Sequence, residues 1–174
     1  MNTVNKYNIY MRIAHWLLAV LIIGALTVGF IMTDMDAANP LKRELYGMHK
    51  SFGVLILALV VIRFGIRLAS KIPPYPKELN RRDILLSHAV VVLLYCLMFI
   101  MPISGYIMST AGGYGVMFFG IPVPSLVSKD LVLSSFAQLL HNYAGYFFAA
   151  AIILHLLGTI KHYLVEKINL LNRL

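Results

Sequence analysis

The chain has 174 residues, of which 60% are hydrophobic and 13% charged, and its formal net charge is +8. A soluble domain of this length has no core large enough to hide so much apolar side chain, so the composition favours a membrane protein. The single cysteine, Cys96, excludes an internal disulfide.

Four long apolar segments follow one another along the chain, at about residues 13–33, 45–69, 84–108 and 136–164. Each is long enough to cross about 30 Å of hydrocarbon as a helix. The first run is longer than the apolar core of a signal peptide, so we take it as a retained helix. Because the four segments use most of the chain, we predict one domain over residues 1–174, an all-α four-helix transmembrane bundle.

Basic residues are distributed unevenly between the ends of these segments. Eleven of the fifteen Lys and Arg residues flank the N-terminus, the connection between the second and third segments, or the C-terminus. The other four are Lys42, Arg43, Lys50 and Lys129. Since Lys and Arg are retained on the cytoplasmic side of a membrane, both termini are predicted to be cytoplasmic. The charge therefore reports topology and contact with membrane lipid, and it does not indicate binding to nucleic acid.

The connections between the segments differ in character. "SKIPPYPKELNRR", with Pro73, Pro74 and Pro76, is predicted to be a short, stiff cytoplasmic linker that stops the second helix. The segment from Ser109 to Ser135 is longer and remains apolar. We expect it to fold along the outer membrane surface as a lid.

The chain has six histidines, and the predicted topology gives each one a depth. Those near the cytoplasmic face are His15, His88, His155 and His162, and those near the outer face are His49 and His141. Fourteen residues separate His141 from His155, which is about 21 Å along a helix and nearly the same face. The last segment thus offers an imidazole at each of two depths. The first segment offers a partner at the inner depth and the second segment a partner at the outer depth.

These depths predict two histidine pairs, His15 with His155 and His49 with His141. Two stacked pairs on facing helices suit two haems, because haem iron takes two opposed axial ligands and the porphyrin needs an apolar slot. The stretches "HKSFG" and "HNYAG" each place a glycine four residues after a histidine, on the same helix face, which leaves room beside the imidazole for a flat group.

The histidines also allow other interpretations. Any single one can simply hydrogen-bond a neighbouring helix within the membrane. Zinc is less favoured, because zinc sites gather three or four ligands at one depth and no acidic residue lies within a span. His162 and His88 have no partner in the two pairs.

Several motifs together resemble the prokaryotic cytochrome b561 family. They are "RIAHW", "MHKSFG", "SHAVVVLLYCLMFIMPISG", "FFGIPVP" and the H-x13-H-x6-H spacing of the last segment. The resemblance implies a bacterial inner-membrane, multi-pass cytochrome with two b-type haems, whose axial ligands match His15, His49, His141 and His155. It also implies a link to ubiquinone, with superoxide at the periplasmic face as a donor in some members. His162 and His88 are then candidates to bind a quinone carbonyl or to relay its proton, and an interfacial side chain wetted by lipid headgroups is the alternative for His162. The chain departs from the family at Val91, where a histidine is common, and in a C-terminal tail with Lys167-Ile168-Asn169 where an acidic residue is common.

The sequence therefore predicts a quinone-linked oxidoreductase that carries electrons from the outer face to ubiquinone, with superoxide as the proposed donor. One alternative is the haem-bearing anchor of a hydrogenase- or dehydrogenase-type complex, with a redox partner protein. A proton or metal transporter is a further alternative, which the missing buried carboxylates disfavour. A purely structural membrane protein leaves the paired depths unexplained.

Overall fold

The computed structural model describes residues 6–76 and 78–173; residues 1–5, 77 and 174, which the predicted domain includes, lie outside that part. Its four long helices are α1 (Ile9–Asp34), α2 (Pro40–Ala69), α3 (Arg81–Ala111) and α4 (Leu131–Leu164). All four are long and apolar enough to cross a membrane. The predicted all-α, four-helix transmembrane bundle is confirmed.

Each helix extends beyond its predicted apolar segment, because a polar residue caps its first turn. The side chains of Asn8, Asn39 and Asn80 accept hydrogen bonds from backbone N–H groups two or three residues later. Asp130 does the same for two N–H groups of α4, at 2.9 and 3.0 Å. Such caps satisfy N–H groups that have no partner within the helix. They start each helix several residues before the apolar segment from which it was predicted.

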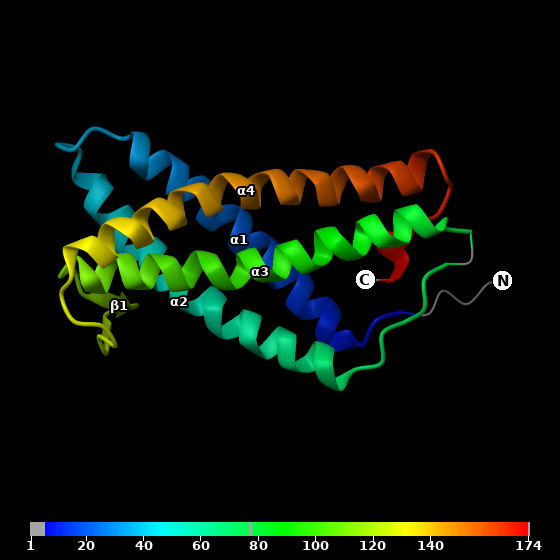
Figure 1. Cartoon of the computed structure of the whole chain (residues 1–174), viewed down its shortest axis with the longest axis horizontal. Helices are drawn as coiled ribbons and strands as arrows, with labels where there is room; N and C mark the ends of the chain where they lie inside the picture. Colours follow the sequence, from blue (N-terminus) through cyan, green and yellow to red (C-terminus); the bar gives the residue numbers. More distant parts are fainter. Residues whose placement is uncertain (1–5, 77, 174) are drawn as a thin grey trace.

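The helices pack in chain order, α1 on α2, α2 on α3 and α3 on α4 (Figure 1). A cluster of buried apolar residues joins them: Leu18, Ile22, Ile56, Val60, Tyr95, Leu97, Met98, Ala144, Phe148 and Ala151. Most other large apolar side chains point outward. This arrangement is expected where lipid rather than water surrounds a bundle.

One end of the bundle collects the α2–α3 connection and both ends of the described chain (Figure 1). The short helix η1 (Leu170–Arg173) folds back here. Arg173 is buried and donates hydrogen bonds of 2.8 Å to the carbonyls of Pro73 and Pro74. Tyr7 N–H donates to the Arg173 carbonyl at 2.9 Å. We call this the inner end and the opposite one the outer end; that the inner end is cytoplasmic stays a prediction.

The outer end carries a small hairpin that the sequence did not predict. Strands β1 (Val116–Phe118) and β2 (Ile121–Val123) pair antiparallel within the predicted lid segment. The turn has positive φ at Phe119 and at Gly120, which is the geometry of a tight hairpin. The Ser51 hydroxyl of α2 donates to the Met117 carbonyl at 2.9 Å and accepts from Phe119 N–H at 3.1 Å. These two bonds tie the hairpin to the bundle beside the outer histidines.

Candidate functional site

The structure brings the four paired histidines together as predicted from their depths. The rings of His49 on α2 and His141 on α4 have centroids 6.2 Å apart. The rings of His15 on α1 and His155 on α4 have centroids 6.4 Å apart. The two pairs lie near opposite ends of the bundle, and α4 contributes one member to each.

These separations match two imidazoles that share one metal ion. An imidazole nitrogen binds a metal at about 2.0 Å, so two opposed rings on one ion have centroids about 6.3 Å apart. Both observed values lie within about 0.1 Å of that figure.

Apolar cavities adjoin the outer pair. One, of about 450 Å³, is bounded by residues of α1, α2, α3 and α4, and another, of about 430 Å³, reaches the hairpin. His49, His141 and Gly53 line both. A porphyrin extends sideways from an iron held between two rings, so space beside the ring pair is what haem needs.

The predicted role of the glycines is supported at one position. A Cβ at Gly53 meets no protein atom within 4 Å, so this glycine keeps the cavities open. A Cβ at Gly145 meets the Met101 methyl at 3.7 Å, which is ordinary contact. Two other glycines lie against the imidazoles: a Cβ at Gly29 comes within 3.3 Å of His49, and one at Gly105 within 2.9 Å of His141.

The hydrogen bonds of His141 leave one nitrogen free to act as a ligand. Its Nδ1 lies 2.9 Å from the Met101 carbonyl oxygen and 3.2 Å from the Ser104 hydroxyl oxygen. A carbonyl only accepts, so Nδ1 carries the hydrogen and Nε2 keeps its lone pair. Metal-bound histidines commonly donate their second N–H to a backbone carbonyl. His49 Nδ1 is buried without a hydrogen-bond partner among the described residues.

The inner pair has a charged neighbour that the sequence analysis missed. A terminal nitrogen of Arg63 on α2 lies 3.1 Å from His15 Nδ1. The Arg63 guanidinium carbon also lies 5.4 Å from the centre of the Tyr95 ring. Six residues separate Arg63 from the end of α2, so the signal available in the sequence was a basic residue placed inside a span.

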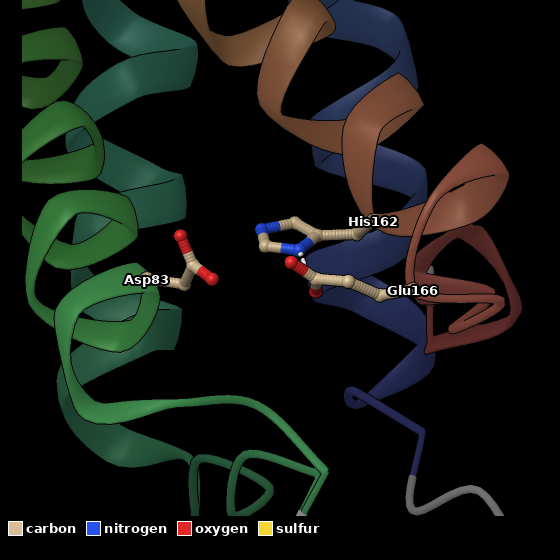
Figure 2. A group of neighbouring side chains, drawn as sticks. All are labelled: Asp83, His162 and Glu166. Carbon is tan, nitrogen blue, oxygen red and sulfur yellow. Dashed lines mark hydrogen bonds and ion pairs between the residues drawn. The ribbon is translucent and has the colours of Figure 1, made fainter.

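His162 lies in a separate polar cluster at the inner end (Figure 2). It is only 4% exposed, and its Nδ1–H donates to the Glu166 carboxylate at 2.6 Å. Lys161 bridges that carboxylate, at 2.9 Å, and Asp83 at the start of α3, at 2.7 Å. The hydrogen bond from Lys161, and then that from His162, lowers the pKa of Glu166 below its usual value of 4.5. Glu166 therefore holds a negative charge beside a buried imidazole at neutral pH.

The histidine candidates outside the pairs have different surroundings. His88 is exposed on α3, and no hydrogen bond or ring contact joins it to His162 in the part of the chain that the structure describes. Asp83 and Glu166 were not predicted as site residues from the sequence. For Glu166 the signal was available, because it follows His162 by four residues at the end of a helix.

Comparison with known proteins agrees with this arrangement. The sequence pattern of the family described as prokaryotic cytochrome b561 matches residues 6–174. "Cytochrome b561 homolog 2" of Escherichia coli is 28% identical over 174 residues, which cover 99% of this chain and 93% of that protein. "Probable superoxide oxidase CybB" of Yersinia pestis is 25% identical over 171 residues, 97% of this chain and 95% of that protein. The chain therefore belongs to the prokaryotic cytochrome b561 family of membrane electron-transfer proteins, and membership implies b-type haem.

Proposed function

We propose that the chain is a dihaem cytochrome, with one haem b between His49 and His141 and another between His15 and His155. The observation that carries this proposal is the pair of ring separations, 6.2 and 6.4 Å, at two depths of one bundle. Haem held in this way supplies an iron that gains and loses one electron.

The chain's own residues define the surroundings of the proposed outer haem. The Met101 carbonyl fixes the orientation of the His141 ring and its tautomer, whereas an imidazole free in solution has neither fixed. Apolar side chains from the four helices bound the cavity beside it and limit access of water. The hairpin, held by Ser51, borders the other cavity. An apolar surrounding of this kind lowers the local dielectric and so affects the redox potential of the group it holds.

The proposed route runs from the outer end to the inner end of the bundle, in a bacterial inner membrane. Along α4 the two histidine levels are separated by about 21 Å. We propose superoxide as the donor at the outer end, on the strength of the printed name of the Yersinia relative. Lys50, which lines an outer cavity, is the basic residue best placed to attract an anion there.

Ubiquinone is the proposed acceptor, at the inner end beside His162. Its reduction to ubiquinol takes two electrons and two protons, and oxidation of two superoxide anions to two O₂ supplies the two electrons. His162 is buried, and Glu166 orients its ring through Nδ1, so in the protonated ring Nε2–H is left to donate to a quinone carbonyl and to pass it that proton. His88, exposed on α3, is a second candidate for proton delivery from the inner face.

The first test is a reduced-minus-oxidised absorption spectrum of the purified protein, with haem quantified per chain. Two b-type haems per chain are expected. His141→Ala and His155→Ala should each retain one, and the variant Cys96→Ala, at an exposed position of α3, should retain both. No haem in the wild-type protein, or two haems in His141→Ala, contradicts the ligand assignment.

The acceptor is tested separately. With superoxide supplied enzymatically, the wild-type protein should reduce a soluble ubiquinone at a rate that depends on protein concentration. A protein whose two haems are reduced by superoxide but which transfers no electrons to ubiquinone would retain the cofactor assignment and exclude this acceptor.

A further inference from the structure

A half-buried positive charge without a carboxylate partner among the described residues lies beside the inner histidine pair. Arg63 projects from α2 between His15 and Tyr95. Its Nε atom is buried and has no hydrogen-bond partner among the described residues. Guanidinium groups in an apolar interior are normally paired with carboxylates or phosphates, because the ion is costly to desolvate alone.

No carboxylate in the described part of the chain takes that place. Its ion pairs join Lys161 and His162 to Asp83 and Glu166 only. The same deficiency recurs at Arg12, whose buried Nε atom also lacks a partner. Arg12 precedes His15 by three residues on α1, so both lie on one face of that helix. Two guanidinium groups with unused donors thus lie near His15: Arg63 is in contact with it, and Arg12 is three residues before it on the same helix.

The contact between Arg63 and His15 cannot persist if His15 binds iron as a neutral imidazole. Arg63 can only donate hydrogen bonds, so His15 Nδ1 has to accept. A neutral imidazole has one accepting nitrogen, and iron takes it. The remaining nitrogen carries the hydrogen, and Arg63 then needs another acceptor.

We propose that Arg63, together with Arg12, binds the carboxylate groups of the inner haem. The proposal rests on the proposed haem between His15 and His155. Haem b carries two propionate carboxylates, and a guanidinium binds a carboxylate through two parallel N–H donors. The two arginines provide unused donors for two carboxylates. Arg12 lies on α1, the helix that carries His15, and Arg63 lies on α2, which packs against α1.

The test uses the intact haem-loaded protein, in which the haem carboxylates carry ¹³C. Redox-difference infrared spectra report the carboxylate stretching bands, and transfer of haem to an excess of a haem-scavenging protein gives the dissociation rate. Arg63→Gln should shift the labelled bands and release one of the two haems at least about tenfold faster, which corresponds to about 1.4 kcal/mol. Arg43→Gln, at an exposed position of the same helix, should change neither quantity.

Arg63→Lys keeps the charge but loses the paired donors, so it should shift the bands and release haem at an intermediate rate. It also provides the measurement if Arg63→Gln fails to accumulate. Unchanged bands in Arg63→Lys overturn the proposal. Faster haem loss without a band shift overturns it as well, because Arg63 then acts only through His15. A wild-type protein without haem refutes the proposed function instead, which separates the two failures.

Discussion

Substitution of Gly105 by alanine tests whether His141 has a single permitted position. A Cβ at Gly105 is placed 2.9 Å from Cε1 of His141 and 3.2 Å from its Nδ1. Real Cβ atoms essentially never approach other atoms that closely, so the imidazole has to move away from α3. That motion lengthens the 2.9 Å hydrogen bond between Nδ1 and the Met101 carbonyl.

Two opposing effects set the magnitude. Alanine favours the helix over glycine by about 1 kcal/mol. Overpacking in a tight site costs about 1–3 kcal/mol, and a weakened hydrogen bond costs about 0.5–1.5 kcal/mol. The overall helix content should therefore stay near wild type, whereas haem binding at the outer pair weakens by about 1–3 kcal/mol. That range corresponds to roughly five- to 150-fold faster loss of one haem.

The assay is haem dissociation to a scavenging protein, followed at the absorption band of the reduced cytochrome. Gly24→Ala is the matched control, because it makes the same change within a helix and its Cβ meets nothing within 4 Å. One fast and one unchanged phase are expected for Gly105→Ala, and two unchanged phases for Gly24→Ala. Two unchanged phases for Gly105→Ala would refute the reasoning, as would equal acceleration of both.

Three further predictions concern the cavities and the inner cluster. Gly53→Ala should stabilise α2 in the haem-free protein and still lower haem loading, because its Cβ fills cavity space and touches no protein atom within 4 Å; Gly47→Ala, which lines neither cavity, should leave loading unchanged. His162→Ala should retain both haems and slow ubiquinone reduction about a hundredfold, and loss of a haem in this variant contradicts the acceptor role. The Glu166 carboxylate, whose pKa is lowered in the folded protein, stabilises it above pH 4.5, and this contribution is lost as the pH falls through the folded pKa. Melting temperatures in detergent should therefore be lower for Glu166→Gln than for wild type at pH 7 and should converge as the pH falls below the folded pKa of Glu166, and a constant difference contradicts the linkage.

Sequence reasoning located the histidine pairs because depth in a membrane is nearly a one-dimensional quantity. Once the spans and their directions are assigned, a residue such as His155 has a height fixed by its position in the helix. Sequence alone does not give lateral neighbours, so nothing in it showed that Arg63 of α2 meets His15 of α1. The contact between His162 and Glu166 could have been predicted more easily, because it depends only on a spacing of four residues along a helix.

The helix ends and the hairpin were harder for a different reason. Asn8 and Asn39 start their helices through single side-chain hydrogen bonds, which an average over many apolar residues does not detect. The hairpin turn contains Phe119 with φ 49°, a conformation that a bulky residue rarely adopts. Its strands depend on Ser51, more than sixty residues earlier in the chain, to hold them. A contact of that separation is visible only after folding.

The closure of the inner end by Arg173 has a consequence for how the protein is made. Arg173 follows all four helices in the chain, so the ribosome adds it after α4 has been synthesised. Its hydrogen bonds to Pro73 and Pro74, and that from Tyr7 to its carbonyl, are therefore among the last contacts to form. Until then Tyr7 and the Pro73–Pro74 segment lack the connection that Arg173 provides. Arg173 thus ties these segments together only after all four helices have been synthesised.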